Sequence, residues 1–243
     1  MTGNSIVSHW LFVTDVDDTL VGDDDSLANL ASALKLKREE VLLAFNSSRP
    51  CASVRKTIQD NPLVPEPDFL AGALGTEIEL QDGQPLEEYS SVFNVGWDRE
   101  AVAVLMEQIG LRAHPDEFQT PYKASYSILR QEQYHEALDL LANNGIEVKV
   151  IYSGHTNLDL IPKNAGKGAA IQYLLRRLDI QPERVVAAGD SKNDLDMFGS
   201  PNRVIIVGNA EADIKSLKGE HIYQARAGYA AGVLEGLHFW GVL

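Results

Sequence analysis

Residues 11–20 read LFVTDVDDTL, an apolar run that ends in a cluster of acidic side chains. The run Leu11–Thr14 is short and apolar, as strands buried in a parallel sheet are. Because side chains two residues apart in an extended chain point to the same side, we expect Asp15 and Asp17 to face one space. Substrates of open α/β sheets bind beyond the carboxyl ends of the strands, where these carboxylates lie. A solvated acidic turn is the alternative interpretation of the pair, and we prefer it for Asp18.

The rest of the chain alternates short apolar runs with helix-periodic segments, which is typical of a parallel α/β sheet. Further strands are expected at residues 41–46, 69–71, 185–188 and 204–207, and helices at 26–36, 53–59, 167–178 and 194–198. Between them lies an α+β pattern, with helices expected at residues 98–109 and 132–142 and strands at 123–129 and 147–152. The sequence therefore predicts an α/β core in two pieces, residues 1–82 and 161–243, with an inserted α+β domain at residues 83–160.

The chain has 243 residues, with 21 basic and 35 acidic side chains and a formal net charge of −14. Nucleic acid and anionic membrane surfaces bind proteins with a basic footprint, so we expect neither as a partner. The one cysteine, Cys51, excludes an internal disulfide and fits a reducing compartment. No signal-peptide pattern is present, and no stretch approaches the ~20 apolar residues of a membrane helix. We expect a soluble cytoplasmic protein that captures any phosphorylated substrate through local positive groups.

A second acidic cluster, residues 189–194 with the sequence GDSKND, follows the strand expected at residues 185–188. Its first carboxylate, Asp190, is therefore expected at the same edge of the sheet as Asp15. Carboxylates from two strand ends supply hard oxygen ligands, which suit Mg²⁺ and leave space for water and substrate oxygens. Taken alone, Asp190 is explained as a helix N-cap and Asp194 as a surface acid. Two such clusters in one α/β core favour a metal site.

Two further residues follow or begin elements near these clusters. Ser47 comes after the second strand, and Lys167 begins a helix after Gly166. The Ser47 hydroxyl and amide can donate to a phosphate, while a lysine at a helix start opposes the helix dipole and is unexpected in a purely structural role. A turn serine and a solvated lysine are the structural alternatives. Combined with the carboxylates, the two residues predict a phosphate site.

These motifs, in this order, resemble those of the haloacid-dehalogenase-like (HAD) phosphatases: Asp15-x-Asp17-x-Thr19, Ser47, Lys167 and Gly189-Asp190-x-x-Asn193-Asp194. The inserted domain is similar to the C2-type cap of that superfamily. Four stretches also resemble the sucrose-6-phosphate phosphatase family: residues 15–22 (DVDDTLVG), 73–78 (ALGTEI), 123–126 (KASY) and 151–168 (IYSGHTNLDLIPKNAGKG). The resemblance implies a Rossmann-like HAD core and a cap that recognises the sugar.

The resemblance also implies catalytic roles in the core. Asp15 is the implied nucleophile, which attacks phosphorus and forms an aspartyl-phosphate. Asp17 is the implied acid that protonates the leaving sugar oxygen and the implied base for the hydrolytic water. Ser47 and Lys167 are implied to hold the phosphoryl oxygens and neutralise their charge.

The implied cofactor is Mg²⁺. Its implied ligands are the carboxylates of Asp15 and Asp190 and the backbone carbonyl of Asp17. Asn193 and Asp194 are implied to orient these groups from outside the metal's own ligands, with Asp194 paired to the catalytic lysine.

The implied substrate contacts are Ser47, Arg49, Lys123, Asn157, Lys167 and Asn193. For Arg49 and Lys123, solvated side chains are the structural alternatives. Asn157 stands where the family usually has an aspartate, and Ser48 stands where a glycine often follows the hydroxyl residue. An amide has one acceptor oxygen and also donates, so the departure at Asn157 leaves the identity of the sugar open.

We expect a phosphatase that converts sucrose-6-phosphate to sucrose and phosphate. Mannosyl-3-phosphoglycerate and glucosylglycerol phosphate are the alternative substrates. A dehalogenase needs no acid for its halide leaving group, so Asp17 disfavours that activity, and Lys167 lies outside any P-loop pattern. The alternative from another class is a catalytically idle relative that binds a sugar phosphate or a partner enzyme, which the presence of both Asp15 and Asp17 disfavours. We expect a monomer whose cap closes over the substrate, with the upstream sugar-phosphate synthase as a protein partner.

Overall fold

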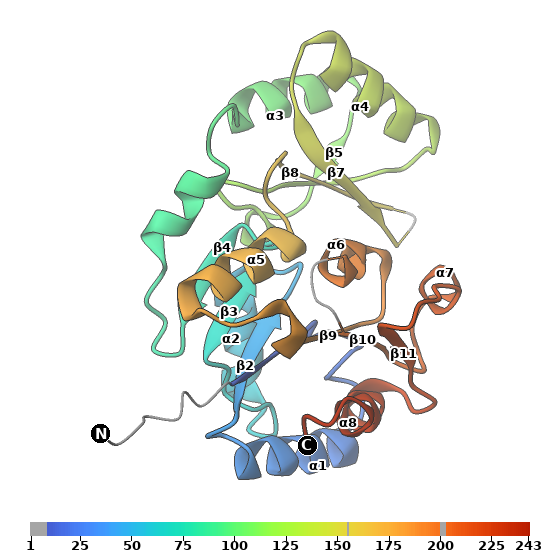
Figure 1. The fold of residues 1–243 in the computed structure, drawn as a ribbon. Coiled ribbons are helices and arrows are strands. Elements are labelled where there is room, and N and C mark those ends of the chain that lie inside the picture. Colours follow the sequence, from blue (N-terminus) through green and yellow to red (C-terminus); the bar gives the residue numbers. More distant parts are fainter. Residues whose placement is uncertain (1–8, 155, 200–202) are drawn as a thin grey trace.

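The computed structural model of this chain describes residues 9–154, 156–199 and 203–243. Its larger sheet has seven strands in the order β11-β10-β9-β1-β2-β3-β4, and neighbouring strands are parallel except β3 and β4 (Figure 1). The strands are β1 (Trp10–Thr14), β2 (Val41–Asn46), β3 (Phe69–Gly72), β4 (Glu77–Leu80), β9 (Val185–Gly189), β10 (Arg203–Ile206) and β11 (Ile222–Gln224). This arrangement confirms the predicted α/β fold with a mostly parallel sheet.

The helices around this sheet follow the apolar periodicity of their segments. They are α1 (Asp24–Leu36), α2 (Cys51–Asp60), α5 (Lys167–Leu178), α6 (Leu195–Phe198), α7 (Ala212–Lys215) and α8 (Tyr229–Phe239), with the 3-10 helices η3 (Pro182–Arg184) and η4 (Lys192–Asp194). In α1, Asp23 caps the first turn by accepting a hydrogen bond from the Ser26 amide. The buried face of α1 consists of Leu27, Leu30 and Leu34. None of the described helices has the length and apolar character needed to cross a membrane.

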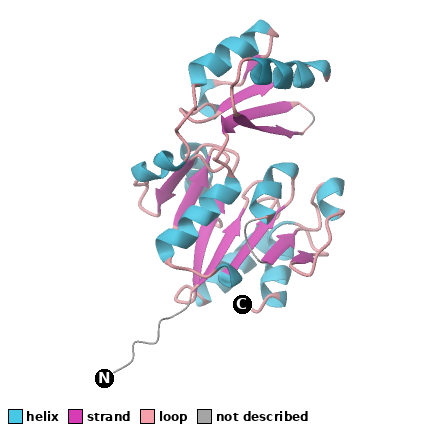
Figure 2. Cartoon of the chain, turned by 45° about the horizontal axis from the view of Figure 1, so that its top comes forward, coloured by secondary structure: helices cyan, strands magenta, loops and turns pink. Residues whose placement is uncertain are grey.

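A smaller sheet lies above the first and is antiparallel, in the order β5-β6-β8-β7. Its strands are β5 (Arg112–Ala113), β6 (Ala124–Ser127), β7 (Val148–Ser153) and β8 (Asn157–Pro162), and its helices are α3 (Arg99–Gln108), α4 (Glu132–Asn143) and the 3-10 helices η1 (Glu87–Val92) and η2 (Asp116–Phe118). Helices α3 and α4 cover the face of the sheet that points away from the larger sheet (Figure 2). A separate apolar cluster, which includes Val102, Met106 and Leu158, fills the space between them. The sequence analysis missed β5 and β8.

The exact limits of the inserted domain stay a prediction. Strand β8 of the smaller sheet continues to Pro162, beyond the expected limit at residue 160. Tyr89 and Phe93 lie within the expected insertion, yet they pack with the apolar cluster of the larger sheet. Residues 1–8 of the expected core lie outside the described part of the chain.

Candidate active site

The carboxyl ends of three strands meet where the larger sheet faces the smaller one. Strand β1 lies between β2 and β9, with Thr14 opposite both Phe45 and Ala188. The Asp15 amide donates to the Ala188 carbonyl at 3.0 Å, which holds the end of β1 against β9. Because the strands end in register, the residues that follow them emerge at one edge of the sheet.

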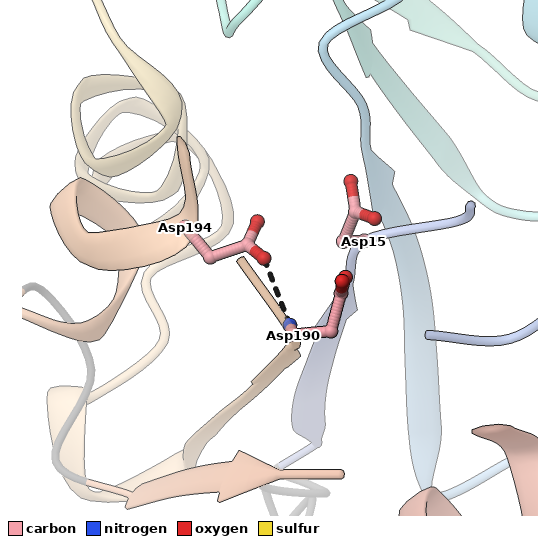
Figure 3. A group of neighbouring side chains, drawn as sticks. All are labelled: Asp15, Asp190 and Asp194. Carbon is pink, nitrogen blue, oxygen red and sulfur yellow. Dashed lines mark hydrogen bonds between the residues drawn. The ribbon is translucent and has the colours of Figure 1, made fainter. Parts of the chain in front are cut away.

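Three carboxylates gather at this edge (Figure 3). One carboxylate oxygen from each of Asp15, Asp190 and Asp194 lies within 4.8 Å of those from the other two. All three side chains are buried. The Thr19 hydroxyl donates to Oδ1 of Asp190 at 2.8 Å, which links the two acidic motifs. The structure therefore brings together the motifs that the sequence analysis combined.

Asp194 fixes the loop that carries this second acidic motif. Its Oδ2 accepts hydrogen bonds from the amides of Asp190 and Ser191, at 2.9 and 3.0 Å. A Cβ atom on Gly189 would lie 2.5 Å from the same oxygen, so a larger residue would displace it. The glycine is thus required for a close approach, and not for a positive φ, which it does not have.

Lys167 projects from the first residue of α5 into the carboxylate cluster. Its Nζ lies 2.7 Å from Oδ1 of Asp15 and 2.6 Å from Oδ1 of Asp194, and the side chain is 1% exposed. Burial raises the pKa of Asp15 well above its usual range, although Lys167 acts in the opposite direction. Burial also raises the pKa of Asp190 to about 7, with the Asp194 charge adding to the effect. For Lys167 itself, burial lowers the pKa, but the attraction of its two carboxylate partners outweighs burial and raises the pKa.

The charges and donor atoms of the cluster fit a hard divalent cation. Three buried carboxylates face a single ammonium group, which leaves an excess of negative charge. Within the described part of the chain, Asp190 forms no ion pair, because Lys167 is engaged by the other two carboxylates. The Oδ1 atom of Asn193 is also buried and has no hydrogen-bond partner among the described residues. Hard oxygen donors with uncompensated charge are the chemistry that such a cation satisfies.

Asp17 lies outside this cluster and is held by Arg49. The Nε and Nη2 atoms of Arg49 donate to the two carboxylate oxygens of Asp17 at 2.8 and 3.0 Å. A third nitrogen, Nη1, donates to the Thr57 hydroxyl of α2 at 3.0 Å, which anchors the guanidinium. The Asp17 side chain is 50% exposed, so it can move. Arg49, predicted as a substrate contact, has this carboxylate as its partner here, and contact with substrate stays a prediction.

Residues at the end of β2 line the site on its other side. Ser47 is buried, and its amide donates to the Ala71 carbonyl at 2.9 Å. The sequence analysis offered this amide to a phosphate, but the strand pairing of β2 with β3 already engages it, so only the hydroxyl of Ser47 stays a predicted phosphate donor. The neighbouring Asn46 was missed by the sequence analysis. Its Nδ2 donates to the Lys167 carbonyl at 2.9 Å, which ties the start of α5 to β2. The available signal was one amide side chain at the end of an otherwise apolar strand.

A cavity of ≈ 420 Å³ lies between the two sheets. Its lining includes Ser48 and Arg49 from the core side and His114, Lys123 and Asn157 from the cap side. The cavity thus contains three of the predicted substrate contacts. His114 was not predicted, since an isolated histidine gives no signal in the sequence.

Lys123 crosses from the cap to the core. Its buried Nζ donates to the Ser48 carbonyl at 3.0 Å and lies 3.3 Å from Oδ1 of Asp159. Asp159 also accepts a hydrogen bond from the Ser125 hydroxyl. Lys123 was expected to face a sugar, and the structure adds a buried carboxylate beside it that the sequence analysis did not single out.

Residues 8–241 match a family model described as sucrose-6F-phosphate phosphohydrolase. The chain belongs to this family. Membership confirms the predicted resemblance to sucrose-6-phosphate phosphatases and to the HAD superfamily, and it makes the chain a phosphoric monoester hydrolase of the HAD sugar-phosphatase type.

Individual relatives agree with this assignment. The chain is 32% identical to mannosylfructose-phosphate phosphatase of Agrobacterium fabrum, over 96% of this chain and 97% of that protein. It is 28% identical to sucrose-phosphatase 1 of Nicotiana tabacum, over 94% of this chain but only 59% of the tobacco protein. Among solved structures, the sucrose-phosphatase of Synechocystis in complex with sucrose and phosphate superimposes with a TM-score of 0.89. That pair is 28% identical, over 96% of this chain and 98% of the other.

Proposed function

We propose that this family member hydrolyses sucrose-6-phosphate to sucrose and inorganic phosphate, with Mg²⁺ as its metal and an aspartyl-phosphate as its intermediate. The observation that carries the proposal is the buried contact between Asp15 and Lys167, at the edge of the sheet where β1 and β9 end. Arg49 connects this edge to the cap cavity, because it lines the cavity and pairs with Asp17. A buried carboxylate beside a positive group suits a nucleophile that must attack a phosphate ester despite its charge.

In the first half of the proposed reaction, a carboxylate oxygen of Asp15 attacks phosphorus and the bond to the sugar oxygen breaks. Asp17 gives its proton to the departing sugar oxygen, which leaves as an alcohol. Lys167 and the hydroxyl of Ser47 donate to the phosphoryl oxygens, while the Ser47 amide stays bonded to the Ala71 carbonyl. In the second half, Asp17 takes a proton from a water molecule, whose oxygen attacks phosphorus and releases phosphate from Asp15.

The pairing of Asp17 with Arg49 restricts how the acid step begins. Both carboxylate oxygens of Asp17 accept hydrogen bonds from the guanidinium. A protonated carboxyl has to use one oxygen as a donor, so Asp17 must turn away from Arg49 before it protonates the sugar. A phosphate or sugar oxygen that binds Arg49 in its place would release Asp17 at the right moment.

Mg²⁺ would be held by carboxylate oxygens of Asp15 and Asp190 and by the backbone carbonyl of Asp17. When bound, it would neutralise charge on the phosphoryl oxygens. Asp194 supports the proposed ligands by fixing the amide of Asp190. The unpartnered Oδ1 of Asn193 is the other group available to orient a ligand or substrate oxygen.

The identity of the sugar depends on the cap side of the cavity, where we propose that Lys123 and Asn157 contact hydroxyl groups. Mannosylfructose phosphate is a second candidate substrate, because the relative that acts on it by name is 32% identical over nearly the whole chain. Mannosyl-3-phosphoglycerate and glucosylglycerol phosphate stay as further alternatives. All four esters carry a hydroxylated leaving group, which suits the polar side chains in the lining of the cavity.

The decisive experiment measures phosphate release and kcat/KM on these four esters with Mg²⁺, for the natural sequence and for Asp15→Asn. We expect the highest kcat/KM on sucrose-6-phosphate and no turnover by the variant. A higher value on another ester would replace the substrate while keeping the reaction. No release from any of them would support the non-catalytic binding protein.

The proposal extends to the setting of the enzyme. We propose a cytoplasmic monomer that receives its substrate from an upstream sugar-phosphate synthase and binds neither nucleic acid nor membranes. Light scattering coupled to size-exclusion chromatography tests the oligomeric state, and pull-down with the purified synthase tests the partner.

A further inference from the structure

One ion pair joins the cap to core helix α6, which in turn contacts the start of the helix that carries Lys167. Nζ of Lys149, on cap strand β7, lies 3.0 Å from Oδ1 of Asp196 on core helix α6. Figure 1 places α6 below the smaller sheet, at the junction of the two layers. Neither residue belongs to the motifs that the sequence analysis singled out.

Asp196 is also bound to the start of α5. Its second oxygen, Oδ2, accepts a hydrogen bond from the Gly168 amide at 2.8 Å. The residue that precedes the helix, Gly166, has no side chain with which to cap it. The Asp196 carboxylate therefore takes the place of an N-cap residue, next to the positive end of the helix dipole.

The packing at this point leaves little freedom. A Cβ atom on Gly166 would lie 2.3 Å from Oδ2 of Asp196 and 2.5 Å from Nζ of Lys149. The chain before α5 thus runs directly against the ion pair. Asp196 contacts the first turn of α5 through its hydrogen bond with the Gly168 amide, and Lys149 reaches that turn through Asp196.

That first turn begins with Lys167, whose Nζ contacts Asp15. The Lys167 carbonyl is held on the opposite side by Asn46. The position of the lysine is therefore set by two contacts on its own turn, one from β2 and one from Asp196. Phosphoryl transfer depends on such positioning, because small displacements of a group that binds the phosphoryl oxygens reduce the rate.

We infer that Lys149 and Asp196 are positioning residues: the cap, when seated on the core, uses Lys149 to hold Asp196 against the α5 amide and so fixes Lys167 for catalysis. This inference rests on the proposed function, in that the cap and the lysine serve one phosphatase reaction. It goes further by assigning the cap a role in the geometry of the core, separate from contact with the sugar.

The test compares Lys149→Met, Lys149→Arg and Asp196→Asn with the natural sequence. The matched control is Lys163→Met, which removes an equal charge from the exposed pair of Lys163 with Glu147. Two quantities are measured: kcat and KM on sucrose-6-phosphate, and hydrogen exchange of the peptide that covers the start of α5 in the substrate-free protein.

We expect Lys149→Met to lower kcat about fivefold to tenfold with little change in KM, and to speed exchange at the Gly168 amide. Asp196→Asn keeps an oxygen for that amide but loses the charge that binds Lys149. We therefore expect it to lower kcat as much as Lys149→Met does, and the double variant to have nearly the same kcat as either single variant. Lys149→Arg keeps the positive charge, so we expect it to retain the natural kcat and the natural exchange rate. Lys163→Met should also match the natural sequence in both quantities.

The inference would be overturned if Lys149→Met had the same kcat and the same hydrogen exchange at the start of α5 as the natural sequence. It would also be overturned if Lys163→Met changed both quantities as much as Lys149→Met. Failure of the proposed function gives a different result. In that case the unsubstituted enzyme itself releases no phosphate from sucrose-6-phosphate, while the exchange measurement still reports whether Lys149 orders the start of α5.

Discussion

Lys167 and Asp15 form a buried ion pair, with Nζ 2.7 Å from Oδ1, although Lys167 begins a helix and Asp15 follows a strand 152 positions earlier. The pair depends on Asn46 and Asp196, which hold the first turn of α5 from two sides. The lysine is thus the one positive group that the described part of the site sets against three buried carboxylates.

Removal of that positive group should harm both stability and catalysis. In Lys167→Met the buried carboxylates lose their ion-pair partner, which costs about 3–5 kcal/mol when a buried pair is broken. We expect the free energy of unfolding in urea to fall by that order and phosphate release to be lost. Addition of Mg²⁺ should recover part of the lost stability but not the activity. If, with no metal added, Lys167→Met were as stable as the natural sequence, Lys167 would not be needed to compensate the charge of the buried carboxylates.

The metal should stabilise the protein in a pH-dependent manner. In the metal-free protein, burial raises the pKa of Asp190 to about 7, above the value of an unfolded chain. Between about pH 4 and 7, Asp190 is protonated in the folded state and ionised in the unfolded chain. The stability that this proton contributes to the folded state is lost as the pH rises through 7. Mg²⁺ requires the ionised carboxylate, so it should raise the Tm more at pH 8 than at pH 6.

Asp190→Asn is the control for this pH effect. It removes the titrating group and a proposed ligand, so we expect the stabilisation by Mg²⁺ to be weak and to differ little between the two pH values. Equal stabilisation of the natural sequence at both pH values would exclude Asp190 as a ligand.

Replacement of Asp17 should affect substrates according to their leaving groups. In Asp17→Asn, kcat on sucrose-6-phosphate should fall by about 10²–10⁴, because an alkoxide leaves poorly without a proton. On p-nitrophenyl phosphate the formation of the aspartyl-phosphate needs no acid, so a burst of nitrophenol should remain visible in rapid-mixing experiments. Loss of that burst would mean that Asp17 serves mainly to bind Mg²⁺ or substrate.

Asn157 should influence the choice of sugar and not the chemistry. In Asn157→Asp the amide donor becomes a carboxylate acceptor at the edge of the cap cavity. We expect the ratio of kcat/KM for sucrose-6-phosphate to that for mannosylfructose phosphate to rise about tenfold, within the range of one hydrogen bond. Turnover of p-nitrophenyl phosphate, which has no sugar, should stay unchanged; an equal loss on all three esters would show a general disturbance instead.

Gly166→Ala should destabilise the protein more than a comparable substitution in an open turn. Gly166 has a φ of +136°, and a Cβ there would lie 2.3 Å from Oδ2 of Asp196. Gly110→Ala is the matched control, because Gly110 has a φ of +66° and a Cβ on it would meet no atom within 4 Å among the described residues. In urea unfolding, we expect the free energy of unfolding to fall by about 1 kcal/mol in the control and by about 2–4 kcal/mol in Gly166→Ala. Equal losses would mean that the close approach relaxes without a free-energy penalty.

The sequence was sufficient for those parts of the site that follow strand ends. Asp15 and Asp190 lie at one edge because parallel strands carry their carboxyl ends on the same side, and they meet because β1 and β9 are neighbours in the sheet. The strand ends predicted that Asp15 and Asp190 would share this edge, while the pairing of Asp194 with Lys167 was implied by the family resemblance. The parallel α/β fold was likewise accessible, since each strand is a short apolar run between helix-periodic segments.

The missed features depend on contacts that no local pattern records. Strand β8 has the sequence NLDLIP, and its buried Asp159 is explained by Lys123 and Ser125 from another strand and its flank. Asn46 and Asp196 act through backbone groups of α5, far away along the chain. Arg49 was noticed, but its pairing with Asp17 follows from the fold and not from the spacing of the two residues.

Strand β8 begins at Asn157 beside the cap cavity and ends at Pro162, and residues 163–166 alone separate it from the helix that starts with Lys167. The same short piece of chain thus reaches from the region of substrate choice to the phosphate site. Transplantation of a cap from a relative with another sugar preference should therefore use a junction after Pro162, so that the whole strand moves as one unit. A junction inside β8 would join two half-strands that pack against side chains of different proteins. The mismatch would disturb the start of α5, and with it the catalytic centre that the graft was meant to leave intact.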